Sequence, residues 1–230
     1  MAMGRALAIG IDVPKRGVYR ALGSLTVAEA DARYLAALAR SKGFATETLL
    51  GPAATRAAVV ARITAAAKAL APGDIFLLSF SGHGDWVPDH NRDDPDRRDE
   101  SWCLYDGRLI DDQLPRLWAR FKPRVRIVVI SDSCYSGKIT GIDGPGHPRV
   151  KATVLLISAC QETEQAFEDR SYSVFIKALK KVWNRGRFQG TYKGLWQGIR
   201  SEIGSPRQQP NYLVVGAGNA AFERQQPFTV

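Results

Sequence analysis

Short apolar runs alternate along the chain with stretches in which apolar residues recur every three or four positions. The short runs predict buried strands, and the recurring pattern predicts amphipathic helices. We expect strands at residues 6–12, 45–50, 75–80, 125–130, 152–158 and 212–215. We expect helices at residues 26–42, 55–70, 111–121, 171–185 and 191–203. This alternation favours an α/β sandwich with a mostly parallel sheet.

Two of the predicted strands run into loops that carry reactive side chains, His83 after residues 75–80 and Cys134 after residues 125–130. Because the carboxyl ends of parallel strands meet at one edge of a sheet, we expect the imidazole and the thiol to be neighbours. The thiolate is the reactive form of cysteine, and imidazole can take its proton and later protonate a leaving amine. The backbone N–H groups of Gly84 and Cys134 would bind the oxyanion of a tetrahedral intermediate. The two loops therefore predict a cysteine nucleophile paired with a histidine.

The plainer alternative is that His83 is a turn residue and Cys134 a buried core thiol. The glycine-flanked loops at two equivalent strand ends favour catalysis over that alternative. Cys103 has no histidine near it in the sequence and is expected at a half-buried strand position, and Cys160 has no evident base. Three cysteines without metal-ligand spacing argue against a disulfide framework and a zinc site.

Length and composition favour one sizeable domain over residues 1–230, with two small domains as the alternative. The chain has no apolar run long enough to span a bilayer, so we expect no membrane partner. Its first residues lack the pattern of a secretory signal, which makes the cytoplasm the expected compartment. We expect a monomer.

The net charge of +9 is unevenly distributed. Residues 170–210 carry nine Lys and Arg residues against Glu202 alone, but they lack the motifs of single-strand binders. A solvated basic face is therefore favoured over nucleic-acid binding. Residues 89–112, which we expect to form a loop, carry nine acidic residues. These acids are Asp89, Asp93, Asp94, Asp96, Asp99, Glu100, Asp106, Asp111 and Asp112.

The chain resembles the caspase–hemoglobinase clan, and most closely the metacaspases and bacterial orthocaspases. Residues 81–84 (Ser-Gly-His-Gly) match the clan's histidine motif, and residues 132–137 (Asp-Ser-Cys-Tyr-Ser-Gly) resemble the metacaspase cysteine motif. The separation of about fifty residues between the two motifs is similar to that in caspases. The likeness extends to the opening strand, Asp31-Ala32, and residues 109–112, 157–161 and 209–213. It implies a caspase-like three-layer sandwich with a mostly parallel six-stranded central sheet and helices on both faces.

The resemblance also implies how the chain is organised. Residues 1–136 would correspond to a large-subunit-like part with the His/Cys dyad, and residues 152–230 to a small-subunit-like part. Residues 137–151 would connect the two parts. Lys138, Arg149 and Lys151 lie in or beside this connection, which makes self-cleavage there a hypothesis.

The family implies hydrolysis of peptide bonds after Arg or Lys, so the expected partners are protein or peptide substrates with those residues. Asp132 precedes the nucleophile by two residues, and by analogy Asp31 would pair with it at the floor of the pocket, with Ser81 lining the wall. Two carboxylates in a desolvated cleft favour a guanidinium or ammonium group. The alternatives are an exposed helix charge for Asp31 and a loop-capping role for Asp132. Val27 stands where the family usually has glycine, so the start of the first helix is expected to differ.

The resemblance further implies calcium as a possible cofactor and no organic cofactor. Calcium takes six to eight oxygen ligands, largely carboxylates. The matching acids are Asp96, Asp99, Asp111, Asp112 and Asp143. The chain has Gly141 before Asp143 where the family's last ligand is expected, which is a departure from the pattern. The alternative is a solvated acidic loop. For the whole chain, the alternative function is an inactive caspase-like binding or regulatory module.

Overall fold

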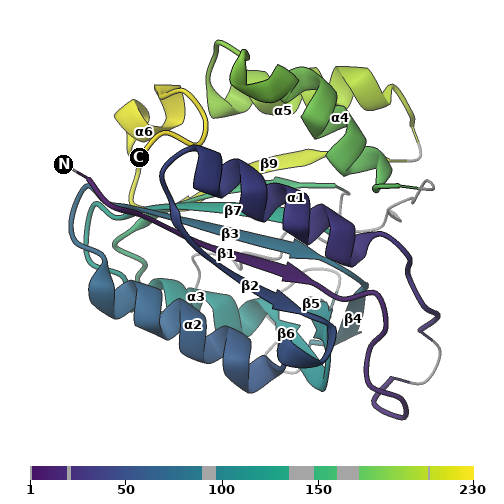
Figure 1. Ribbon diagram of the computed structural model, residues 1–230. Coiled ribbons are helices and arrows are strands. Elements are labelled where there is room, and N and C mark those ends of the chain that lie inside the picture. The colour runs from purple at the N-terminus through teal and green to yellow at the C-terminus, as the bar shows by residue number, and fades with distance from the viewer. Residues whose placement is uncertain (1, 20–21, 90–96, 135–147, 160–170, 207) are drawn as a thin grey trace.

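A six-stranded sheet forms the centre of the molecule (Figure 1). The computed structural model describes residues 2–19, 22–89, 97–134, 148–159, 171–206 and 208–230. From edge to edge the strands are β2 (Ala45–Leu50), β1 (Gly4–Gly10), β3 (Ile75–Ser81), β7 (Arg126–Asp132), β8 (Thr153–Ser158) and β9 (Asn211–Gly216). Neighbouring strands are parallel except for β9, which is antiparallel to β8. The predicted mostly parallel, six-stranded sheet is confirmed.

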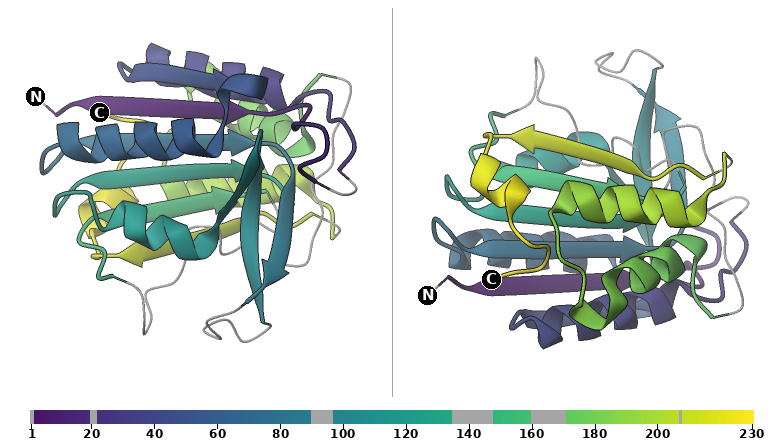
Figure 2. Two further views of the ribbon diagram at one scale, coloured as in Figure 1. Left: turned by 90° about the horizontal axis from the view of Figure 1, so that it is seen from below. Right: turned by 90° about the horizontal axis from the view of Figure 1, so that it is seen from above.

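Helices cover both faces of this sheet (Figures 1 and 2). One face carries α2 (Arg56–Ala69) and α3 (Leu114–Trp118). The other face carries α1 (Ala28–Ser41), α4 (Val174–Trp183), α5 (Tyr192–Ile203) and the short α6 (Ala220–Arg224), which the sequence pattern did not predict. Short 3-10 turns lie at Gly51–Ala53, Asp111–Gln113 and Asn184–Gly186. None of the helices in the described ranges has the length and apolar character needed to cross a membrane.

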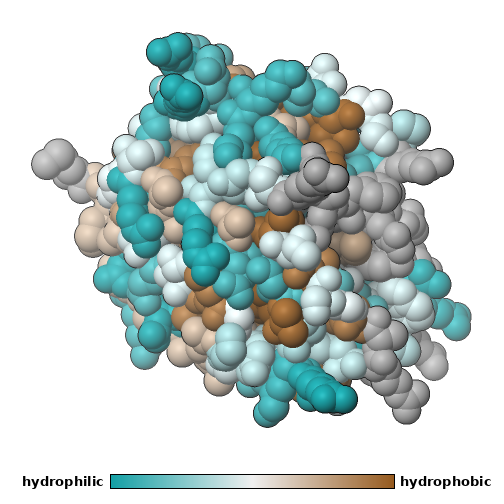
Figure 3. All heavy atoms as spheres, turned by 45° about the vertical axis from the view of Figure 1, so that its right-hand side comes forward, coloured by the Kyte–Doolittle hydropathy of each residue, from teal (hydrophilic) through white to brown (hydrophobic). Residues whose placement is uncertain are grey.

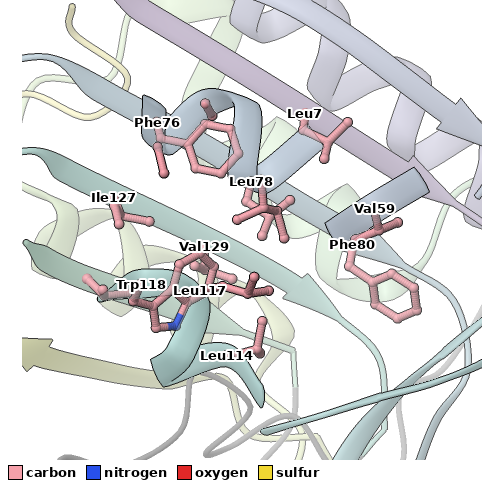
Figure 4. Close-up of a cluster of buried hydrophobic side chains, with 14 of the residues drawn as sticks. Leu7, Val59, Phe76, Leu78, Phe80, Leu114, Leu117, Trp118, Ile127 and Val129 are labelled. Carbon is pink, nitrogen blue, oxygen red and sulfur yellow. The ribbon is translucent and has the colours of Figure 1, made fainter. Parts of the chain in front are cut away.

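The core is divided by the sheet into two apolar layers. Successive side chains of a strand point to opposite faces. Leu78 and Val129 therefore pack with α2 and α3 (Figure 4), while Leu77 and Val128 pack with α1 and α4. Because both faces are covered, strands β3 and β7 are apolar along nearly their whole length. Apart from Arg126, which begins β7, the polar residues of these two strands lie toward their carboxyl ends.

Helix α1 approaches β1 closely where it begins. A side chain on Gly10 would place its Cβ 2.7 Å from both the Ala28 carbonyl oxygen and the Ala32 Cβ, so glycine permits this approach. Val27 precedes the helix and offers no side-chain cap. Asp12 Oδ1 instead accepts a hydrogen bond of 3.2 Å from the Glu29 N–H. The start of α1 is therefore held by the loop after β1 rather than by its own capping residue.

The expectation of a loop at residues 89–112 was wrong for its described part. Three antiparallel strands form a small second sheet there, β4 (Gly84–Pro88), β5 (Arg98–Leu104) and β6 (Gly107–Ile110). Trp102 anchors this sheet, since its ring is fully buried and stacks on Phe80 with centroids 4.9 Å apart. Cys103 beside it is 1% exposed, not half-buried. The small sheet projects from the carboxyl edge of the main sheet (Figure 2, left).

The helix predicted at residues 111–121 is also shorter than expected. It divides into the 3-10 turn Asp111–Gln113 and the five-residue α3. Pro115 supplies no N–H and sits at the start of α3, where such a donor is not needed. The turn carries Asp111 and Asp112 to the side of β5.

Candidate active site

The histidine and cysteine loops leave two neighbouring strands at the same level. The register of β3 and β7 places Ser81 opposite Asp132. The Gly82 N–H donates a hydrogen bond of 3.2 Å to the Asp132 carbonyl oxygen, which extends the pairing past the end of β3. The sheet thus brings the two predicted loops together at its carboxyl edge.

The backbones of Gly84 and Cys134 are in direct contact. An ideal Cβ on Gly84 would overlap the Cys134 carbonyl oxygen and lie 2.8 Å from its carbonyl carbon. It would also lie 3.2 Å from the Cys134 nitrogen. Any side chain at position 84 would therefore push the two loops apart, and glycine is required for the contact.

His83 is oriented by a backbone carbonyl from a third segment. Its Nε2 lies 2.8 Å from the carbonyl oxygen of Gly23. A carbonyl only accepts hydrogen bonds, so in the neutral imidazole Nε2 carries the proton and Nδ1 keeps its lone pair. The histidine backbone is fixed as well, because the Cys103 N–H donates to the His83 carbonyl at 2.9 Å. Nothing in the sequence indicated this role for Gly23, because every residue carries a backbone carbonyl.

Buried polar side chains anchor the residues just before the nucleophile candidate. The Trp102 indole N–H donates to Ser131 Oγ at 2.9 Å, and Ser131 Oγ lies 3.3 Å from Ser133 Oγ. This chain of hydrogen bonds ties the small sheet to the end of β7. Cys134 itself is half-buried at the end of that segment.

The buried Cys103 is poorly suited to be a nucleophile. Burial, followed by the negative charge of Asp85, raises the pKa of its thiol to about 12. Cys103 therefore remains a thiol at neutral pH, which is the unreactive form. Cys160 lies outside the described residues.

Asp31 and Asp132 form a buried carboxylate pair at the end of β7. Their exposures are 1% and 5%, so the alternative of an exposed helix charge for Asp31 is wrong. The Ser173 N–H donates to both Asp31 oxygens, at 3.2 and 3.4 Å. Burial, together with the nearby charge of Asp132, raises the pKa of Asp31 to about 8. The Asp31 carboxyl therefore keeps its proton to a higher pH than an ordinary aspartate does.

Ser81 lies beside this pair. Its hydroxyl is 1% exposed and has no hydrogen-bond partner among the described residues. In Figure 3 the side of the molecule that carries the carboxyl edge of the sheet is turned toward the viewer, and hydrophobic side chains reach the surface near the middle of the view. A buried hydroxyl next to two carboxylates offers polar partners to an incoming cationic side chain.

A second group of acids lies between β5 and the 3-10 turn. One carboxylate oxygen from each of Asp99, Asp111 and Asp112 lies within 4.8 Å of the others. Asp99 and Asp111 are buried, so the alternative of a solvated loop is wrong for them. Asp111 accepts hydrogen bonds from the backbone N–H groups of Glu100 at 3.2 Å and Asp112 at 2.9 Å. Burial, and then a hydrogen bond with the Glu100 side chain, raises the pKa of Asp111 to about 10.

These three carboxylates fit a hard cation, because calcium and magnesium both prefer carboxylate oxygens. Glu100 is 3% exposed and lies in the same group, although sequence reasoning did not single it out. Of the other predicted ligands, Asp96 and Asp143 lie outside the described residues, as does most of the predicted connection at 137–151.

Comparison with known proteins identifies the fold and the family. A family model described as a caspase domain matches residues 3–220. The chain belongs to the caspase-domain family. This caspase domain matches the crystal structure of protein GSU0716 from Geobacter sulfurreducens, with a TM-score of 0.88, 38% identity and 99% coverage of both chains. It matches Caspase-1 from Spodoptera frugiperda with a TM-score of 0.62 and 14% identity, over 94% of this chain and 86% of that one. The predicted caspase-like fold is confirmed.

Metacaspases are among the relatives of this caspase domain. Metacaspase-1B of Aspergillus fumigatus is 35% identical over 96 residues, which cover 40% of this chain and 23% of that protein. Metacaspase-1A of the same species is 38% identical over 71 residues, which cover 29% of this chain and 17% of that protein. The matched stretch thus spans less than a quarter of these relatives. The predicted resemblance to metacaspases is confirmed, and the family assigns the caspase domain to the cysteine peptidases.

Proposed function

We propose that this caspase domain is an endopeptidase that cleaves after Arg or Lys, with Cys134 as nucleophile and His83 as base. The observation that carries the proposal is the contact between Gly84 and Cys134. It brings the two loops together while the Gly23 carbonyl holds His83 Nε2. Nδ1 is then left to take the thiol proton.

The reaction would proceed in two stages. His83 Nδ1 takes the proton of Cys134, and the thiolate attacks the scissile carbonyl carbon. The N–H groups of Gly84 and Cys134 bind the resulting oxyanion, a contribution of roughly 3–4 kcal/mol per donor in comparable sites. The intermediate collapses when His83 protonates the leaving amine, and water then hydrolyses the thioester. The Gly23 carbonyl would stabilise the imidazolium in both stages.

The carboxylate pair supports the basic specificity. An Arg side chain would place its guanidinium between Asp31 and Asp132, with the Ser81 hydroxyl as a further partner. The cation would displace the proton that the empty pair holds. An Asp side chain would meet like charge in the same place, so cleavage after Asp is disfavoured.

Calcium activation is the second part of the proposal. Asp99, Asp111 and Asp112 would hold the ion, with Glu100 close by. The ion would supply positive charge that neutralises crowded carboxylates. It would also fasten β5, the strand that carries Trp102 and its hydrogen bond to Ser131, to the turn at Asp111–Gln113.

The test uses fluorogenic peptides that end in Arg, Lys or Asp, each with millimolar calcium and with a chelator. We expect cleavage after Arg and Lys with calcium, and its complete loss in Cys134→Ala and His83→Ala. Cys103→Ala is the matched cysteine control and should stay active if its circular dichroism matches that of the wild type. Absence of cleavage under every condition would instead favour an inactive caspase-like module. Preferred cleavage after Asp would reject the pocket assignment.

A further inference from the structure

Helices α1 and α4 lie on the face of the sheet opposite α2 and α3 (Figure 1). A basic cleft lies between these two helices. Its volume is about 610 Å³. The residues that matter most to its chemistry are Tyr34, Lys42, Lys180, Lys181, Trp183 and Arg185. The lining does not include His83, Cys134, Asp31 or Asp132. The cleft is therefore distinct from the candidate active site.

Positive charge in the cleft exceeds what its surroundings neutralise. Four cations line it, and no acidic residue does so among the described residues. Lys181 is paired with Glu202 at 2.7 Å. Both α1 and α4 end at the cleft, and each carboxyl end carries roughly half a negative charge. Those two ends and Glu202 together offset about two of the four positive charges, so about two remain.

Two of the lysines are held in place by aromatic rings. Lys42 Nζ lies 5.0 Å from the centroid of the Trp183 ring. Lys180 Nζ lies 3.6 Å from the ring of Tyr172 and 4.9 Å from that of Tyr34. Such cation–π contacts restrict long side chains before a ligand arrives. The entropy lost on binding is correspondingly smaller.

The turn after α4 holds Arg185 at the cleft in an unfavourable conformation. Asn184, Arg185 and Gly186 have positive φ angles of 45°, 55° and 87°. Asparagine and glycine tolerate this region, but arginine is disfavoured there because its Cβ crowds the backbone. The turn therefore holds a cationic side chain at the cleft in a conformation that arginine seldom adopts.

We propose that this cleft binds a small molecule through two or more linked phosphate groups. Its volume lies within the range of about 300–1,000 Å³ typical of small-ligand sites. Lysine ammonium groups and an arginine fork are the usual partners of phosphate oxygens. Trp183 is 3% exposed and its ring is occupied by Lys42, so a nucleobase has no open ring to stack on there. Recognition would rest on the phosphates.

A compact anion fits better than an acidic peptide. An extended peptide spaces its residues by about 3.3 Å and turns alternate side chains to opposite sides. Its carboxylates would spread beyond the cations gathered in the cleft. Linked phosphates instead concentrate several charges in the available volume.

The test measures binding of inorganic tripolyphosphate to the full chain by isothermal titration calorimetry at low ionic strength. We expect saturable binding at one site, and an affinity lower by about tenfold or more in Lys42→Gln/Arg185→Gln. Lys68→Gln/Lys193→Gln is the matched control, because it removes the same charge from two exposed helical lysines outside the cleft. Its affinity should stay within about twofold of the wild type.

A second variant separates binding from folding. Arg185→Gly relieves the positive φ angle, so its Tm should be no lower than that of the wild type while its affinity falls. Absence of saturable binding by the wild type would overturn the proposal. An equal loss of tripolyphosphate affinity in Lys68→Gln/Lys193→Gln would overturn it as well. Tighter binding of a glutamate-rich peptide or of duplex DNA at the same salt concentration would reject the ligand class.

Discussion

Two groups of carboxylates, buried except for the half-buried Asp112, lie near the carboxyl edge of the main sheet, and they differ in what surrounds them. The Asp31–Asp132 pair lies between α1 and β7, with a backbone donor from Ser173. The group of Asp99, Asp111 and Asp112 lies on the small sheet and its following turn. In both, burial raises a carboxyl pKa, to about 8 for Asp31 and about 10 for Asp111.

The comparison shows how similar electrostatics can suit different ligands. Each group is destabilised by its own crowding, so each would be stabilised by a cation. The pair is flanked by the hydroxyl of Ser81 and belongs to the edge that carries Cys134, which suits an organic side chain. The second group brings three carboxylate oxygens within 4.8 Å of one another, which suits a single small ion.

The largest expected effect comes from the pair. Asp132→Asn should lower kcat/KM for Arg and Lys peptides by roughly 10- to 100-fold, since it removes a charged partner of the substrate cation. The loss should lie mainly in KM, and steady-state kinetics on the peptide series would measure it. Glu47→Gln, which changes an exposed carboxylate, is the control. An unchanged preference for Arg and Lys would contradict the assignment.

The next effect separates the two groups directly. With saturating calcium, the wild type should gain about 5–10 °C in Tm, because an ion at about a hundred times its Kd stabilises the fold by roughly 2.7 kcal/mol. Asp112→Asn should lose this gain and the calcium stimulation of cleavage. Asp132→Asn should keep the thermal gain. Scanning calorimetry would measure these shifts. If Asp112→Asn and Asp132→Asn lost the same share of the calcium-induced gain in Tm, the two groups would not act separately.

A smaller effect concerns the proton held by the pair. The raised pKa of Asp31 means that a cationic substrate must displace a proton below about pH 8. KM for an Arg peptide should therefore fall several-fold as the pH rises from about 6.5 to 8.5. Titration of inactive Cys134→Ala with the peptide, in buffers of different ionisation enthalpy, should detect proton release at pH 7. Asp31→Asn should release none.

The smallest effect is on stability. The folded pKa of Asp31 is about 8 against an ordinary 3.8, so between these values the folded state keeps a proton that the unfolded state has lost. This group therefore contributes less stability as the pH rises from about 4 to 8. Asp31→Asn should raise Tm by several degrees at pH 8.5 and by little at pH 4. A larger gain at pH 4 than at pH 8.5 would contradict the shift.

The sequence predicted the main sheet well because parallel strands covered on both faces appear as plain apolar runs. The expected adjacency of the His83 and Cys134 loops rested on the common edge at which parallel strands end, and the structure pairs the two strands directly. The small sheet was missed, since β5 begins with Arg98, Asp99 and Glu100, and buried acids have no hydrophobic signal.

Contacts made by the backbone could not be predicted from the residue pattern. The Gly23 carbonyl accepts from His83, and the Ser173 N–H donates to Asp31. Both are backbone groups that almost any residue could supply at these positions. The basic cleft was likewise hidden, because Lys42 lies far in sequence from Lys180 and Arg185. The solvated basic face expected at residues 170–210 is in part the wall of this cleft.

The register that pairs Ser81 with Asp132 also has a consequence for folding kinetics. Bringing these strand ends together closes a loop of about fifty residues, at an entropic cost of roughly 3.5 kcal/mol. Long-range pairing of this kind forms late relative to local helices. In a partly folded chain His83 and Cys134 would lie apart. The proposed hydrolysis would therefore begin only after β3 and β7 have paired along their full length. The topology would thus delay the proposed peptidase activity until the polypeptide has reached its native state.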